Sequence, residues 1–389
     1  MRIAIASIFD PRALGSWSGC SHYLLKALEA QGAELEILGP LRSPESLTDR
    51  VKRKAYAFAG RNYLADIMDP HLADYARQTE AALARSDVDC LLALDGHTIA
   101  RIRTDRPIFY FWDCTFRGNL EYPWFANLAP ECIASGDRME SGALANARLA
   151  FYSSRWAVGS ATRDHGAPEG KVRMVGLGAN LDPAGDMPAA ERLVDARDPE
   201  VLDLLFLGVD WHRKGGDLAL AVVTELNRRG RPTRLTVAGV EPPGAVPDFV
   251  VRRGFLDKRK PEQRQALYDL IGRAHFLIVP SLAESFGCVF AEANAFATPA
   301  LARRVGGLPS VIRDDVNGRL FDRDTGPEPY ADYIQEVMGE PGRYRRLAFS
   351  SSAEFKSRLN WDRQAALLLG HMAEALAPPH PGSPLRSPG

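Results

Sequence analysis

The chain has 389 residues, 46% of them hydrophobic, which is enough to bury two ordinary hydrophobic cores. Its formal net charge of -1 excludes a generic nucleic-acid binder, because such proteins carry a strong basic excess. The five cysteines are scattered and never in C-x-x-C spacing, which fits a reducing compartment and no structural zinc.

The first half of the chain alternates short apolar segments with amphipathic ones, which predicts a parallel sheet wrapped by helices. The expected strands are 3–8, 35–38, 88–94, 108–112 and 149–153. A helical stripe from Tyr23 to Leu28 follows the first strand and ends at Gly32, a C-terminal cap. The N-terminus lacks the features of a signal peptide, and no apolar run approaches the roughly 20 residues of a membrane span. We therefore expect a cytoplasmic protein whose only membrane contact would be peripheral.

Residues 50–61 contain five basic residues, no acid and interleaved aromatic residues. Two interpretations fit this pattern. The segment is either a surface that touches anionic lipid or a lipid-diphosphate acceptor, or a basic helix on the rim of the first domain.

Residues 176–199 combine turn-forming residues with little periodicity, which predicts an interdomain linker. A second Rossmann-like series begins near Leu202, and the last helix is expected over Trp361 to Leu376. The predicted organisation is a Rossmann-like domain over 1–180, a second over 183–355, a C-terminal helix over 356–377 and a disordered tail over 378–389.

The most informative segment carries two carboxylates, Glu284 and Glu292, across a strand-to-helix junction. The preceding residues 275–279 are apolar, as in a strand buried on both faces, and apolar residues then recur at helical spacing. Glu284 therefore lies in the loop after a strand, and Glu292 lies on the helix about two turns further on. Unpaired N–H groups where the helix opens favour a phosphate. The residues at this junction are Phe286, Gly287, Cys288 and Val289.

This arrangement resembles the E-x7-E signature of retaining glycosyltransferases of family 4, which have the GT-B fold. Other segments match the family in the same order: 204–208 with 213–217, 235–239, 251–256, 305–309 and 317–321. The resemblance implies two doubly wound, Rossmann-like α/β domains facing each other across a cleft. It also implies a C-terminal helix that crosses back onto the first domain.

The resemblance assigns roles to charged residues. Glu284 matches the glutamate that contacts donor-sugar hydroxyls, and Glu292 matches the one that binds the ribose hydroxyls. Lys214 matches the phosphate-binding lysine. Val209 stands where the family usually has an arginine, so Arg213 is the expected substitute. Two adjacent cations suit a pyrophosphate that gains negative charge as the bond breaks.

The resemblance also points to five further positions in the expected site, and for two of them a structural role fits equally well. Gly208 belongs to the matched glycine turn, and the loop of Gly254 and Phe255 is expected to lie near the base. Gly19 partly preserves a glycine pair near the donor phosphates, although a plain turn fits equally well. Asp113 is either a polar contact to donor or acceptor, placed where relatives have a histidine, or a structural cap.

The predicted activity is retaining, metal-independent transfer of a hexose-type sugar from a UDP- or GDP-linked donor, with no other cofactor. The acceptor is a hydroxyl on a glycan, glycolipid or small molecule. His97 follows another strand end and is either a loop residue or part of the site. The Asp-x-Asp strings at 87–89 and 322–324 are discounted as metal sites, because one precedes its strand and the other lies in a turn. A GT-B nucleotide-sugar epimerase and a non-catalytic nucleotide-sugar-binding subunit are the alternative functions.

Overall fold

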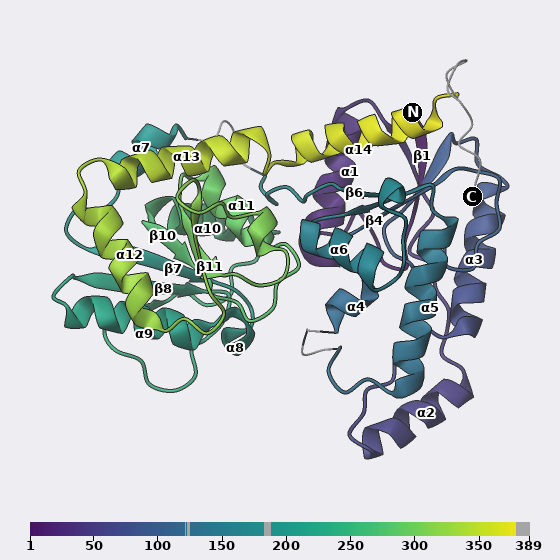
Figure 1. The fold of residues 1–389 in the computed structure, drawn as a ribbon, viewed down its shortest axis with the longest axis horizontal. Coiled ribbons are helices and arrows are strands. Elements are labelled where there is room, and N and C mark those ends of the chain that lie inside the picture. Colours follow the sequence, from purple (N-terminus) through teal and green to yellow (C-terminus); the bar gives the residue numbers. More distant parts are fainter. Residues whose placement is uncertain (121, 123–124, 183–187, 379–389) are drawn as a thin grey trace.

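The computed structural model of the protein describes residues 1–120, 122, 125–182 and 188–378. Two six-stranded sheets with flanking helices form two lobes (Figure 1). The strand order is β2-β1-β3-β4-β5-β6 in the first sheet and β12-β11-β10-β7-β8-β9 in the second. Neighbouring strands pair in parallel throughout both. The prediction of an α/β fold with two Rossmann-like parallel sheets is confirmed.

The first sheet consists of β1 (Arg2–Ala6), β2 (Glu34–Ile37), β3 (Cys90–Ala93), β4 (Ile108–Trp112), β5 (Leu149–Tyr152) and β6 (Val172–Met174). The five expected strands are all present; β4 has the predicted bounds, and the other four have shifted or shorter ends. Strand β6 was not predicted, because it has three residues of which only Val172 is buried. Such a short edge strand leaves no apolar run in the sequence.

The helices of the first lobe are α1 (Cys20–Ala30), α2 (Leu47–Phe58), α3 (Asp69–Leu83), α4 (Phe116–Asn119), α5 (Pro130–Asn146) and α6 (Arg155–Arg163), with 3-10 turns at Ser16–Gly19 and Glu169–Lys171. The predicted stripe of α1 is confirmed, since Tyr23, Leu24 and Leu28 are buried. Gly32 follows the helix with a φ of +82°, a left-handed conformation that glycine adopts without strain.

The second sheet consists of β7 (Leu202–Leu207), β8 (Thr233–Ala238), β9 (Val250–Arg252), β10 (Phe276–Ile278), β11 (Ala300–Arg303) and β12 (Gly318–Phe321). Its helices are α7 (Ala190–Asp195), α8 (Trp211–Lys214), α9 (Gly216–Arg228), α10 (Pro261–Arg273), α11 (Cys288–Ala295), α12 (Pro327–Gly339) and α13 (Arg343–Ser357), with a 3-10 turn at Leu308–Ser310. The matched segments 235–239 and 251–256 lie where β8 and β9 end, as the sequence predicts.

The last helix, α14 (Trp361–Leu376), has the predicted bounds and returns to the first lobe, where it lies along α1 (Figure 1). Two chain segments, one around Ala179 and one around Leu359, cross between the lobes next to the start of α14. The Ala179 N–H donates to the Leu359 carbonyl at 3.0 Å, and the Trp361 indole donates to Asn180 Oδ1 at 2.8 Å. A Cβ on Gly178 would lie 2.4 Å from the Trp361 nitrogen, so this close crossing requires glycine.

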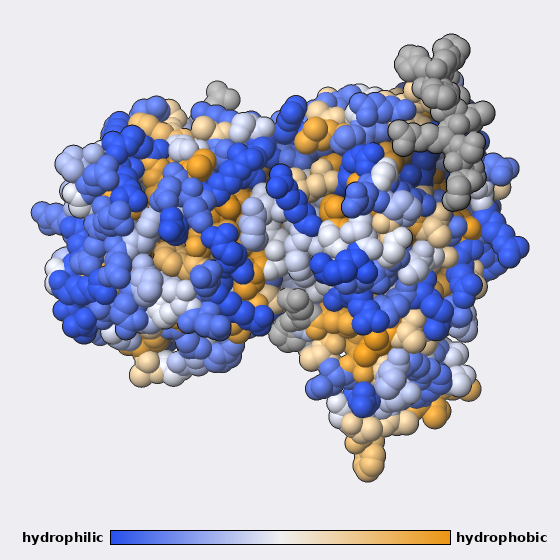
Figure 2. All heavy atoms as spheres, in the orientation of Figure 1, coloured by the Kyte–Doolittle hydropathy of each residue, from blue (hydrophilic) through white to orange (hydrophobic). Residues whose placement is uncertain are grey.

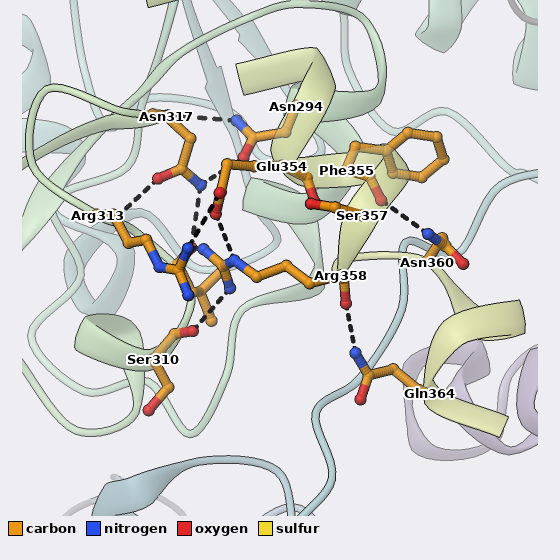
Figure 3. A network of polar contacts seen from close by, with 11 residues as sticks. Asn294, Ser310, Arg313, Asn317, Glu354, Phe355, Ser357, Arg358, Asn360 and Gln364 are labelled. Carbon is orange, nitrogen blue, oxygen red and sulfur yellow. Dashed lines mark hydrogen bonds and ion pairs between the residues drawn. The ribbon is translucent and has the colours of Figure 1, made fainter. Parts of the chain in front are cut away.

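A polar network fixes the turn between α13 and α14 (Figure 3). The Arg358 guanidinium donates to the carbonyls of Ser310, at 2.9 Å, and Val311, at 2.6 Å. Glu354 accepts from Arg358 and also from Arg313, at 3.1 Å. The point where the chain leaves the second lobe is therefore anchored to the loop after β11. Residues 183–187 of the predicted linker, and the predicted tail from 379 onward, lie outside the described residues. The domain boundaries stay predictions.

Candidate active site

A cavity of about 720 Å³ lies between the two lobes, at the carboxyl ends of strands from both sheets. The first lobe contributes Trp17 and Asp113, and the second contributes residues after β7 and β8 and the loop that opens α11. Ligands of open α/β sheets collect at this edge, because the loops and helix N-termini converge there.

Most of the predicted site residues line this cavity: Asp113, Gly208, Arg213, Lys214, Phe255, Glu284, Phe286, Gly287, Cys288, Val289 and Glu292. Two do not line it. Gly19 precedes α1 with a φ of +87°, and its neighbours Ser18 and Cys20 reach the cavity instead. The Gly254 carbonyl accepts the Gly239 N–H at 2.8 Å, so this glycine holds the adjacent strand ends together.

Lys214 and Glu284 meet in the cavity wall. Lys214 Nζ lies 2.5 Å from Glu284 Oε2, and the two side chains are only 12% and 11% exposed. The lysine stem passes over Gly208, where a Cβ would come within 2.9 Å of Lys214 Cγ. Ser281 Oγ also donates to Glu284 Oε2, at 3.2 Å. The predicted phosphate-binding cation and sugar-binding carboxylate are thus neighbours, which their separation in sequence does not show.

Arg213 lies beside this pair. Its Nη1 is 3.8 Å from Glu284 Oε2 and donates to the Ala283 carbonyl at 3.3 Å. Its guanidinium also lies over the Tyr122 ring, 5.9 Å from the centroid. Val209, which occupies the family's usual arginine position, is 67% exposed. An arginine therefore reaches the site from position 213 and not from position 209.

A glycine pair supports the loop that carries Glu284. The Gly307 N–H donates to the Glu284 carbonyl at 3.0 Å. Gly306 has a φ of +48°, and a Cβ there would lie 2.1 Å from the same carbonyl oxygen. The matched segment 305–309 is therefore a backbone support for the glutamate loop, and any larger residue would displace it.

Glu292 has a partner that the sequence analysis missed. Lys258 Nζ donates to Glu292 Oε1 at 2.6 Å and to the Asn180 carbonyl at 3.3 Å, and Glu292 is 4% exposed. Burial would lower the pKa of Lys258, but the charge of Glu292 and its hydrogen bond raise that pKa above its ordinary value. Lys258 sits in the charged run 257–260, which is typical of a solvated loop. Its place just after the matched segment 251–256 was the one signal that could have found it.

Asp113 and Trp17 are two of the first-lobe residues that line the cavity. Burial raises the pKa of Asp113 to about 6, although hydrogen bonding to Trp17 opposes this rise. Trp17 has a φ of +44°, unusual for a bulky residue, and stacks on Trp112 with ring centroids 4.5 Å apart. Trp17 was not predicted, because a lone tryptophan in a loop carries no periodic signal. His97 does not line the cavity; it lies near Asp66 and Asp95 at 3.8 and 3.6 Å.

The described residues contain no group of three or more His, Cys, Asp or Glu side chains that could hold a metal ion. Within the same part of the chain, no helix is both long enough and apolar enough to cross a membrane.

Two facing lobes with parallel sheets and a cavity at their strand ends define the GT-B class of fold. A sucrose-phosphate synthase from Thermosynechococcus elongatus has the same fold, with a TM-score of 0.67 and 18% identity over 96% of this chain and 98% of that one. Anabaena Alr3699/HepE, solved in complex with UDP, has a TM-score of 0.65 and 13% identity over 96% of this chain and 100% of that one.

Residues 191–353 match the family model described as "Glycosyl transferases group 1". The D-inositol 3-phosphate glycosyltransferase of Frankia alni is 31% identical over 278 residues, which cover 65% of this chain and 67% of that protein. The chain therefore belongs to the glycosyl transferases group 1 family, and the resemblance seen in the sequence is confirmed. Its match to the enzyme of the same name from Nocardiopsis dassonvillei is 30% identical over 56% of this chain and 53% of the relative. The chain thus spans about half the length of several curated relatives that it matches.

Proposed function

We propose that the protein transfers a hexose-type sugar from a nucleotide-diphosphate sugar to a hydroxyl acceptor, with retention of configuration and without a metal ion. The Lys214–Glu284 pair carries this proposal, because it sets a cation and a hydroxyl-binding carboxylate side by side in a cavity between two lobes. Family membership and the relatives' names support transfer. The structural neighbour Alr3699/HepE, solved in complex with UDP, supports a UDP-linked sugar as the donor.

In the proposed mechanism the donor phosphates lie against the N–H groups at the start of α11 and against Lys214. Both stabilise the negative charge that develops as the glycosidic bond to phosphate breaks. Glu284 accepts from the donor-sugar hydroxyls and Glu292 from the ribose. The acceptor enters from the first lobe, past Asp113 and Trp17, and the leaving phosphate takes its proton. A glycosidase-like acid and nucleophile are then unnecessary.

Thermal unfolding with UDP-, GDP-, ADP- and TDP-sugars identifies the donor, because a ligand that binds only the folded protein raises the midpoint. We expect a rise with one base, and incorporation of labelled sugar from that donor into acceptor. Lys214→Ala and Glu284→Gln should each lower turnover on the order of 100-fold. The control is Lys356→Ala, which removes an exposed lysine of α13.

Each alternative outcome of these experiments contradicts one part of the proposal. No midpoint shift across the panel would contradict donor binding in the cavity. Full turnover in Lys214→Ala would contradict the phosphate assignment. Conversion of the donor sugar to its epimer without transfer would indicate the epimerase, and donor binding without either reaction would indicate a binding subunit.

We also propose that α2 contacts anionic lipid. Leu47, Val51 and Phe58 are 78%, 66% and 96% exposed, and their spacing puts them on one face of the helix. Arg50 and Lys54 are exposed beside them. Helix α2 projects at the lower end of the first lobe in Figure 1, and Figure 2 shows hydrophobic and hydrophilic surface together there. Exposed apolar residues flanked by cations are typical of helices that lie in a membrane interface.

Co-sedimentation with phosphatidylcholine vesicles, with and without phosphatidylglycerol, tests this contact. Binding should require the anionic lipid and weaken with salt, because screening shortens the range of the attraction. Phe58→Ser with Val51→Ser should abolish it, whereas Leu282→Ser, which alters an apolar residue exposed elsewhere, should not. Equal binding to both vesicle types would contradict the proposal.

A further inference from the structure

Two cysteines from opposite lobes meet in the wall of the cavity. Cys20 is the first residue of α1 and Cys288 is the first residue of α11. Their sulfur atoms lie 3.4 Å apart, although 268 positions separate the residues in the chain. Both residues border the cavity; Cys20 is 2% exposed and Cys288 is partly exposed. The contact joins two rigid elements of different lobes.

The surroundings of the two sulfurs differ. Asn180 Nδ2 donates to Cys20 Sγ at 3.4 Å, and the orientation of this amide is fixed because Asn180 Oδ1 accepts from the Trp361 indole at 2.8 Å. Both sulfurs lie at the start of a helix, but among the described residues only Cys20 has an N–H group directed at it, and such a group stabilises negative charge on a sulfur. By contrast, the hydrogen bond with Cys20 and burial raise the pKa of Cys288 well above its ordinary value. Cys20 is therefore the better placed nucleophile, and Cys288 stays a thiol.

We propose that Cys20 and Cys288 form a reversible disulfide between the lobes when the protein meets a hydroperoxide. The Cys20 thiolate attacks one peroxide oxygen, the O–O bond breaks, and the leaving oxygen takes up protons to become water or an alcohol. The Cys288 sulfur then displaces hydroxide from the Cys20 sulfenic acid. The S–S bond forms as the S–O bond breaks, and the thiol proton leaves with the hydroxide as water. Two thiols lose two electrons, and the peroxide gains them.

The geometry allows this bond with little movement. A disulfide needs sulfurs about 2.0 Å apart, so the two atoms must approach by about 1.4 Å from their present 3.4 Å. Side-chain rotation and a small shift of the lobes supply an approach of this size. A dithiol reverses the reaction by exchange.

The consequence of the disulfide rests on the proposed function. Cys288 lies where the donor phosphates are proposed to bind, at the start of α11. A bond from its sulfur to α1 ties the lobes together and restricts that end of the cavity. We therefore expect the oxidised protein to bind nucleotide-sugar at least tenfold more weakly. It should also unfold at a temperature several degrees higher, because the cross-link constrains the unfolded chain.

The test treats the reduced full-length protein with hydrogen peroxide at a few equivalents and analyses its peptides by mass spectrometry without reduction. We expect a cross-linked pair of peptides that contain Cys20 and Cys288, about 2 Da lighter than the sum of the free peptides, and its loss with dithiothreitol. Cys20→Ser and Cys288→Ser should each abolish the pair. Cys90→Ala, which removes a fully buried cysteine, should not.

Stable sulfinic acid at Cys20 without a cross-link, or cross-linking through any other cysteine, would overturn the inference. The cross-link is scored by mass and needs no nucleotide. A protein that cross-links but binds no nucleotide-sugar in either state would therefore contradict the proposed function and leave the disulfide intact. Equal donor binding by the reduced and cross-linked forms would overturn the proposed consequence.

Discussion

The carboxyl group of Glu140, on α5, is buried in the first lobe, and its substitution gives a quantitative prediction. Glu140 is 1% exposed and accepts hydrogen bonds from the hydroxyls of Tyr152 and Tyr110 and from the Phe116 N–H at 3.1 Å. Burial raises its pKa from the ordinary 4.5 to about 7, although these hydrogen bonds oppose the rise. The folded protein therefore keeps a proton on Glu140 at a pH where the unfolded chain has lost it.

The sign of the effect follows from proton linkage. Between pH 4.5 and 7, unfolding releases the Glu140 proton, so the free energy of unfolding falls as the pH rises and levels off above about 7. The difference between 4.5 and about 7, at about 1.4 kcal/mol per pKa unit, amounts to about 3 kcal/mol. Glu140→Gln cannot ionise. Its stability should therefore decline less than that of the wild type between pH 5 and pH 8, by about 2 to 3 kcal/mol.

Denaturant unfolding followed by tryptophan fluorescence at pH 5, 6, 7 and 8 measures this difference. Burial lowers the pKa of His275 to about 4, which gives the opposite slope at acid pH. Subtracting the wild-type curve from the variant curve removes that contribution. Glu200→Gln, at an exposed position, should leave the pH dependence unchanged. Parallel curves for Glu140→Gln and the wild type would refute the reasoning, because they would mean that Glu140 is ionised in the folded protein at pH 5.

Three further predictions concern the cavity. Lys258→Met leaves the carboxylate of Glu292 buried without its cation. Donor affinity measured by calorimetry should fall on the order of tenfold, and an unchanged affinity would contradict a role of Lys258 in donor binding. Gly306→Ala places a Cβ 2.1 Å from the Glu284 carbonyl oxygen at a φ of +48°, so the unfolding free energy should drop by about 2 kcal/mol or more, and an unaltered denaturation midpoint would contradict this. Transfer measured with excess EDTA should match transfer with added Mg²⁺; dependence on the metal would refute the metal-independent mechanism.

The elements with strong patterns were predictable from the sequence. Helix α14 has the predicted bounds because its apolar residues recur at helical spacing after the Asn360 cap, which accepts the Arg363 N–H at 2.9 Å. Strand β4 was found because all but one of its residues are buried and apolar. Strand β6 was missed because its burial comes from pairing at the sheet edge, and a tripeptide has no period of its own.

The residues of the candidate site also divide into those that the sequence predicts and those that it does not. Glu284 and Glu292 stand at a fixed spacing on one junction, so local pattern and family resemblance were enough to select them. The contacts that depend on tertiary structure could not be predicted from the sequence. Lys258 reaches Glu292 from the loop after β9, and Trp17 reaches the cavity from the loop after β1. Loop residues of this kind are placed by the scaffold, which sequence reasoning reconstructs only in outline.

The two lysine–glutamate contacts explain how a site built around carboxylates would accept the diphosphate of the proposed donor. In the proposed mechanism Glu284 and Glu292 hold hydroxyl groups, but two buried carboxylates alone would repel the donor phosphates. Lys214 lies against the first and Lys258 against the second, so each negative charge is balanced where it stands. Under the proposed function the N–H groups at the start of α11 would then meet the phosphates in a pocket without net charge from these four side chains. Lys214 ends helix α8, which follows β7, and Lys258 lies in the loop after β9. The charge balance of the site therefore appears only in the folded chain.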